Sequence, residues 1–200
     1  MIMGIILNFP VGCYNHLLSR TLHARPLEVP TMPHAVLILG TDHRFQMRSD
    51  NFSESQHQQF DSHVKAIASE YKVAGLVEEN SPQAVAEKDR KESTVQTIAR
   101  DLGLKHLHCD PDKKTRDALK IHQENEICAD AFFERVNETE IKRRIDESLR
   151  KRERYWLTEL QKFDTWPVLF ICGADHALPF LDLLRTNNVD AIVIDEDWGT

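Results

Sequence analysis

The stretch Val36-Leu-Ile-Leu-Gly-Thr-Asp-His43 has a close counterpart far along the chain, Val168-Leu-Phe-Ile-Cys-Gly-Ala-Asp-His176. Each is an apolar run that is too short for a helix and that leads into a Gly-x-x-His motif. A continuous run of Val, Ile and Leu of this length is typical of a strand buried on both faces of a parallel sheet. We therefore predict two such strands, each with a histidine just beyond its carboxyl end.

Regular patterning extends from these strands over most of the chain. Apolar runs predict strands at 35–40, 73–77, 104–109, 168–172 and 191–194. Helical spacing predicts helices at 53–71 (with Ser53 as N-cap), 83–101, 124–163 as one or two helices, and 177–186. This alternation indicates an α/β fold, in which helices flank a mostly parallel central sheet of about five strands.

Ionisable residues follow every predicted strand. They are His43, Glu78, Glu79, Asp110, His176 and Asp195. Right-handed crossovers bring the carboxyl ends of parallel strands to one edge of the sheet, which is where ligands of open α/β sheets bind. We therefore expect the functional site at the C-terminal strand edge, built from histidine and carboxylate side chains.

Length and composition indicate one soluble domain. The chain has 200 residues, of which 41% are hydrophobic and 28% charged, values ordinary for a globular protein. Residues 1–31 lack periodicity and contain three prolines, so we expect a poorly ordered N-terminal appendage followed by a single α/β domain at 32–200. Met32 is a candidate start of translation, and whether residues 1–31 are native stays open.

The net charge limits the kinds of partner that we expect, and the cysteines indicate the cellular compartment. The formal charge of −7 argues against a general nucleic-acid binder, so we expect no nucleic acid. The four cysteines are widely spaced and form no Cys-x-x-Cys motif, which fits the reducing cytoplasm. No apolar run approaches the length of a membrane span, and no basic residue precedes the short apolar run at 4–9, so we expect neither a span nor a secretory signal.

His43 and His176 are the leading candidates for chemistry. Imidazole binds divalent metals and titrates near neutrality, so the two rings either share one metal ion or one acts as a general base. The alternative is that each histidine caps a helix or is a solvated loop residue. Asp42 and Asp175, which precede them, would orient the rings or simply form turns, and we favour turns.

A carboxylate and an arginine complete the candidate set. Because side chains alternate across a strand, one of Glu78 and Glu79 should face the site and the other should point away, and the sequence does not say which. The basic run from Lys142 to Arg154 is typical of a solvated helix face, but near Trp156 we expect Arg152 or Glu153 to reach inward. We interpret Asp110 as a turn residue and the run 195–197 as a solvated acidic tail.

These motifs, in this order, resemble the TraB/Tiki superfamily. Gly40-Thr-Asp-His43 and Gly173-Ala-Asp-His176 are similar to its two Gly-x-x-His motifs, and Glu78 or Glu79 to its characteristic glutamate. Arg152-Glu153 with Trp156 resembles its helical Arg-acid-x-x-hydrophobic motif, so the resemblance spans residues 35–186. The chain is short and lacks the transmembrane or accessory helices of many relatives.

The resemblance implies a hydrolase of a peptide or ester with one site between the two loops. Tiki-type members are metal-dependent peptidases, erythromycin-esterase-like members use a histidine base, and ChaN-type members bind haem. We expect His43, Glu78 and His176 to hold a divalent metal (Mn, Co or Zn), with Glu79 as the other candidate carboxylate and Arg152 stabilising the oxyanion. The alternatives are a metal-free histidine base, a non-catalytic small-molecule or haem-binding module, and an accessory protein that acts on a signalling molecule.

Overall fold

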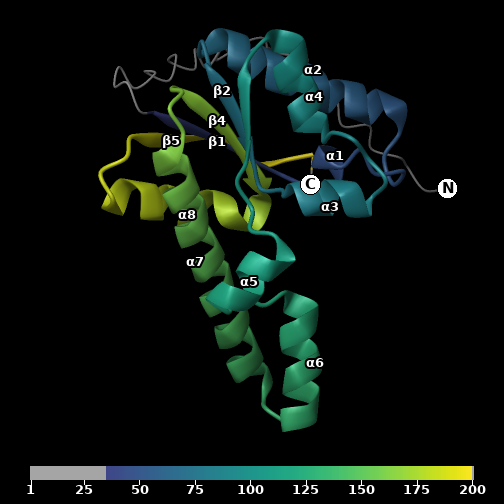
Figure 1. The fold of residues 1–200 in the computed structure, drawn as a ribbon, viewed down its shortest axis with the longest axis vertical. Coiled ribbons are helices and arrows are strands. Elements are labelled where there is room, and N and C mark those ends of the chain that lie inside the picture. Colours follow the sequence, from purple (N-terminus) through teal and green to yellow (C-terminus); the bar gives the residue numbers. More distant parts are fainter. Residues whose placement is uncertain (1–34, 200) are drawn as a thin grey trace, which may run out of the picture.

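A computed structural model describes residues 35–199 of the chain. The N-terminal appendage predicted at 1–31 lies outside the described residues. The described residues form five strands and eight helices, which alternate along most of the sequence (Figure 1). The strands are β1 (Val36–Thr41), β2 (Gly75–Glu78), β3 (Lys105–His108), β4 (Val168–Gly173) and β5 (Ala191–Trp198).

All five strands pair in parallel, in the order β3-β2-β4-β1-β5, which confirms the predicted α/β fold. The two strands with Gly-x-x-His motifs, β1 and β4, are neighbours at the centre of the sheet, and every residue in both is buried. Val36 pairs with Val168 and Thr41 with Gly173. The two motifs therefore follow neighbouring strands at one edge of the sheet, offset by one residue, since Gly40 pairs with Cys172.

Helices cover both faces of the sheet, and each face has its own apolar core. Helices α2 (Glu54–Glu70) and α4 (Thr94–Leu102) pack on the face that carries Leu37, Leu76 and Ile171. Helices α7 (Glu138–Lys162) and α8 (Ala174–Thr186) pack on the face that carries Ile38, Val77 and Phe170. Alternate residues of one strand thus belong to different cores.

The other four helices lie at the ends of these layers. They are α1 (His43–Gln46), α3 (Pro82–Glu87), α5 (Lys113–Leu119) and α6 (Glu124–Glu134). Figure 1 shows that α6 and the adjoining end of α7 extend away from the sheet as a helical hairpin. Its turn follows Arg135, which has a φ of 56°, and Asn137 caps α7.

The structure corrects several predicted elements. The helix expected at 83–101 is two helices, because Asp89 adopts a positive φ and Ser93 caps a new helix through the backbone N–H of Gln96. The run 195–197 is not a tail, since its backbone belongs to β5. Helix α5 was not predicted, whereas Ser53 caps α2 as expected.

No helix among residues 35–199 combines the length and apolar character needed to cross a membrane.

Candidate functional site

The two Gly-x-x-His histidines begin helices at the carboxyl edge of the sheet. His43 is the first residue of α1, and Asp42 caps that helix through the backbone N–H of Arg44 at 2.8 Å. Asp42 is therefore a cap residue, consistent with the turn interpretation. His176 is the third residue of α8, whose N-cap is Gly173.

Glu79 lies between the two imidazoles. Its Oε2 is 3.4 Å from His43 Nε2, and its Oε1 is 3.5 Å from His176 Nε2. The backbone N–H of Gly173 also donates to Oε2, at 2.7 Å. The Glu79 side chain is fully buried. One buried carboxylate thus joins both predicted motifs, which are far apart in the sequence.

Glu78 points to the opposite face of the sheet. It is the last residue of β2 and has the same alternation as Leu76, so its carboxylate enters the core under α4. The predicted metal set of His43, Glu78 and His176 is therefore not brought together. Glu79 takes the position beside the two imidazoles that we assigned to Glu78.

Arg152 reaches inward from α7 and neutralises this carboxylate. Its Nη1 is 2.8 Å from Glu79 Oε1, while Nε and Nη2 donate to the two oxygens of Asp110 at 2.5 and 2.7 Å. Trp156 Nε1 donates to the same Asp110 at 3.0 Å. Asp110, which we interpreted as a turn residue, thus anchors the arginine through a bidentate pair.

These charges keep Glu79 ionised. Burial by itself raises the pKa of Glu79, but the charges of His43, Arg152 and His176, together with the Gly173 N–H, lower it to about 2. Glu79 is therefore an anion throughout the physiological range. Such a group orients or stabilises positive neighbours and does not donate a proton.

Glu153 also belongs to the cluster of side chains around Glu79 and His176, although we did not include it among the predicted site residues. Its Oε1 lies 2.8 Å from His176 Nδ1, and both side chains are buried. Arg150 pairs with the other oxygen at 2.6 Å. A carboxylate at Nδ1 holds that proton on the ring and fixes the orientation of His176. The sequence did indicate that Arg152 or Glu153 reaches inward near Trp156, and in the structure both side chains do.

A cavity of about 1520 Å³ opens beside this cluster. Its walls come from the sheet edge and from the segment between α5 and α7, and they include His43, Arg152 and His176. The His43 side chain is half exposed, whereas that of His176 is 5% exposed. His43 is therefore the imidazole that a bound molecule reaches first.

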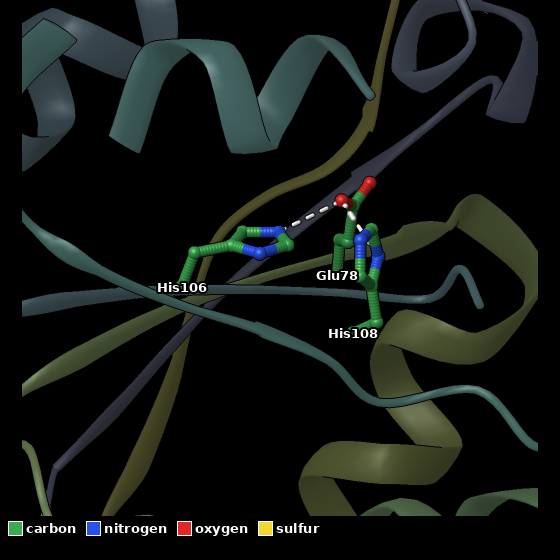
Figure 2. Close-up of side chains that lie close together, drawn as sticks. All are labelled: Glu78, His106 and His108. Atoms are coloured by element: carbon green, nitrogen blue, oxygen red, sulfur yellow. Dashed lines mark hydrogen bonds and ion pairs between the residues drawn. The ribbon is translucent and has the colours of Figure 1, made fainter. Parts of the chain in front are cut away.

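A second polar cluster lies around Glu78, on the face of the sheet under α4 (Figure 2). His106 and His108 are alternate residues of β3, and His106 Nε2 and His108 Nδ1 lie 2.8 and 3.2 Å from Glu78 Oε1. The Ser93 hydroxyl donates to the same oxygen. We did not predict this cluster, although the His-x-His spacing in a predicted strand was a visible signal.

The donor atoms of the two clusters differ in how well they fit a metal ion. Among residues 35–199, only Glu78, His106 and His108 offer three ligand atoms within 4.8 Å of one another. The group of His43, Glu79 and His176 is more open, and Arg152 brings a positive charge into contact with its carboxylate. The predicted metal therefore does not fit the two Gly-x-x-His loops.

Comparisons with protein-family models, with curated proteins and with solved structures found no match.

Proposed function

We propose that the chain is a hydrolase of esters or peptides in which His43 acts as the general base without a metal ion. The observation that carries the proposal is the position of Glu79, which contacts both imidazoles and Arg152 at the wall of a large cavity. The resemblance to the TraB/Tiki superfamily supports the same reaction class, in its histidine-base variant.

His43 is the best candidate for the base because its imidazole is accessible. One ring nitrogen, Nε2, faces the Glu79 carboxylate, which favours a proton at that nitrogen and leaves Nδ1 with a lone pair. Glu79 and His43 thus resemble the carboxylate–histidine pairs of hydrolases. In those pairs the carboxylate orients the ring and stabilises the imidazolium that forms.

Arg152 supplies a positive charge at the site. Arginine has five N–H donors, of which one on Nε and one on Nη2 bond to Asp110, while Nη1 forms an ion pair with Glu79. The other donors are available to an oxyanion that develops in the cavity. Glu153 holds His176 beside them.

The proposed reaction balances with water alone. His43 takes a proton from a water molecule, and the water oxygen bonds to the carbonyl carbon of the substrate. Collapse of the tetrahedral oxyanion breaks the C–O bond of an ester or the C–N bond of a peptide. The imidazolium of His43 returns its proton to the leaving alkoxide or amine.

The test is hydrolysis by His43→Gln compared with the unmodified chain. The probes are p-nitrophenyl acetate, p-nitrophenyl butyrate and a mixture of fluorogenic peptides, and initial rates give kcat/KM. Loss of the base should lower kcat/KM by about 10²- to 10⁴-fold. Circular dichroism should be unchanged, since the side chain is half exposed.

The matched control is His63→Gln. His63 stacks on Trp198 and contributes nothing to the cluster around Glu79, so its variant should hydrolyse each probe at the rate of the unmodified chain. Equal rates for His43→Gln and His63→Gln would contradict the proposal. Failure of the unmodified chain to hydrolyse any ester or peptide probe would contradict it as well.

A further inference from the structure

We propose that Glu78, His106 and His108 bind a divalent transition metal of the zinc class, at a site separate from the cluster around Glu79. The two sites lie on opposite faces of the sheet, because Glu78 and Glu79 are consecutive residues at the end of one strand. The inference does not depend on the proposed hydrolysis.

The spacing of the three side chains suits shared coordination. The register of β2 and β3 pairs Leu76 with His106 and Glu78 with His108, which places both imidazoles on the face that carries Glu78. Two ligands bound tetrahedrally at zinc distances lie about 3.3 Å apart. The separations of 2.8 and 3.2 Å from Glu78 Oε1 are close to this value.

Two atoms of this cluster are buried and have no hydrogen-bond partner. One is Glu78 Oε2, on a side chain with no exposed surface, and the other is His108 Nδ1. Figure 2 shows both rings turned toward one oxygen of Glu78. Buried polar atoms without partners are rare in folded proteins and need an explanation, and a bound ion is one that would serve both atoms at once.

The other nitrogen of His108 indicates what that ligand is. His108 Nε2 lies 3.3 Å from the side-chain oxygen of Gln96, which can only accept, so this nitrogen carries the proton. In a neutral ring Nδ1 then presents a lone pair, 3.2 Å from a carboxylate oxygen but not aligned with it for a hydrogen bond. Ligands of one metal ion have this geometry, since each lone pair points at the ion and not at its neighbour.

The donor set defines the class of metal. Two imidazoles and one carboxylate are the ligands of catalytic zinc sites and of non-haem iron, and they leave a further position for water or for the Ser93 hydroxyl. Calcium and magnesium prefer oxygen ligands and are excluded by the two nitrogens. The two histidine side chains are each 12% exposed on an edge strand, which gives an ion access.

A metal here would connect three elements of the fold. Glu78 comes from β2, the two histidines from β3, and Ser93 is the N-cap of α4. We therefore assign the ion a role in holding the edge strand and the start of α4 to the sheet.

The experiment is metal binding by the full chain after dialysis against EDTA. Zn²⁺ is titrated in competition with a chromophoric chelator, and Co²⁺ is followed by its visible absorption. We expect one equivalent with a Kd below about 10 μM. His106→Gln and His108→Gln should each weaken this affinity by more than about 100-fold, the upper limit for loss of an outer-shell partner.

His43→Gln and His63→Gln are the controls, and both should bind Zn²⁺ like the unmodified chain. They separate this proposal from the proposed function, since His43→Gln should lower kcat/KM for hydrolysis by about 10²- to 10⁴-fold and leave metal binding intact. If a cluster variant fails to fold, the unmodified chain still decides the matter: in ¹⁵N-labelled protein, Zn²⁺ should shift the ring nitrogens of two histidines that His43→Gln and His63→Gln do not remove.

Three results would overturn the proposal. They are the absence of Zn²⁺ and Co²⁺ binding in the unmodified chain, equal affinity in the folded cluster variants, and loss of the equivalent in His43→Gln.

Discussion

Glu79 shows how a single buried charge is tolerated. Its two oxygens meet an arginine, a backbone N–H and two imidazoles, so the cost of burial is offset by four positive or donor groups. Removing a carboxylate of this kind leaves its positive partner buried without a counter-charge, which strongly destabilises the folded state. The Arg152 guanidinium keeps its second partner, Asp110.

The pKa of Glu79 predicts a specific loss of stability in acid. The folded pKa of about 2 lies below the ordinary value of 4.5, so ionisation favours the folded state by about 3 kcal/mol at pH 7. This contribution is complete above pH 4.5 and disappears as the pH falls toward 2. Glu79→Gln should therefore unfold about 3 kcal/mol more easily than the unmodified chain at pH 7, and the difference should vanish near pH 2.

Urea unfolding at a series of pH values measures this difference. Glu70→Gln is the control, because Glu70 is exposed at the end of α2 and its loss should change the free energy of unfolding by less than about 0.5 kcal/mol. A gap between Glu79→Gln and the unmodified chain that stays constant with pH would show that the carboxylate is not held as an anion.

The positions of both imidazoles are set by the junctions at which β1 leads into α1 and β4 leads into α8. Gly173 ends β4 and precedes α8, and a Cβ at this position would lie 2.5 Å from His43 Nε2. The glycine of the second motif is therefore needed by the histidine of the first. In the same way, a Cβ at Gly40 would collide with the backbone oxygen of Glu196.

Gly173→Ala should displace the His43 ring while the fold survives. The backbone at Gly173 has φ −62° and ψ 146°, which alanine adopts without strain. We expect kcat/KM for the ester probes to fall by about 10²-fold, since a misplaced catalytic group is costly. Thermal unfolding and initial rates are measured on the same samples.

Gly103→Ala is the opposite case and serves as the control. Gly103 ends α4 with a φ of 67°, and no atom lies within 4 Å of an added Cβ. This variant should lose about 1 kcal/mol of stability through backbone strain and hydrolyse at the normal rate. Full activity in Gly173→Ala would remove the link between the two motifs.

The sequence predicted the strands and their parallel pairing, and it placed His43 and His176 at one edge of the sheet. Apolar runs followed by Gly-x-x-His are local signals, and β1 and β4 follow them closely. The break between α3 and α4 was missed because Val95 and Ile98 continue the helical spacing, although Ser93 begins a new helix. A single serine that can cap a helix is a weaker sequence signal for a helix start than the periodic spacing of apolar residues is for a continuous helix.

The composition of the site was harder to predict than its position. Alternation shows that Glu78 and Glu79 diverge, but only the pairing of β2 decides which core each one enters. Asp110 has the local pattern of a turn, and its partner Arg152 lies on a helix that is distant in sequence. Such long-range pairs leave no trace in local spacing.

At the scale of the whole molecule, the two clusters differ in how accessible they are. The cluster around Glu79 borders the cavity, whereas the cluster around Glu78 lies under α4 and is nearly enclosed. The helical hairpin of α6 and α7 extends the cavity wall beyond the sheet. The proposed catalytic and metal sites should therefore respond separately to a chelator.

Chelation should lower stability and leave hydrolysis unchanged. If the ion is present at 100 times its Kd, its removal costs about 2.7 kcal/mol, which lowers the Tm of a chain of this size by about 5–10 °C. The Tm is measured with and without EDTA, and kcat/KM is measured well below both transitions. His106→Gln should have a low Tm that EDTA does not change. Loss of hydrolysis on chelation would place the metal in the reaction.

Glu78 ends β2 and Glu79 follows it, so the length of this strand is as important as its composition. Deleting or inserting a single residue ahead of Glu78 would turn each carboxylate toward the other's partners. Both centres would then fail together, although every histidine and the arginine were still encoded. A substitution can alter one of the two centres and leave the other intact, but a one-residue shift within β2 disrupts both.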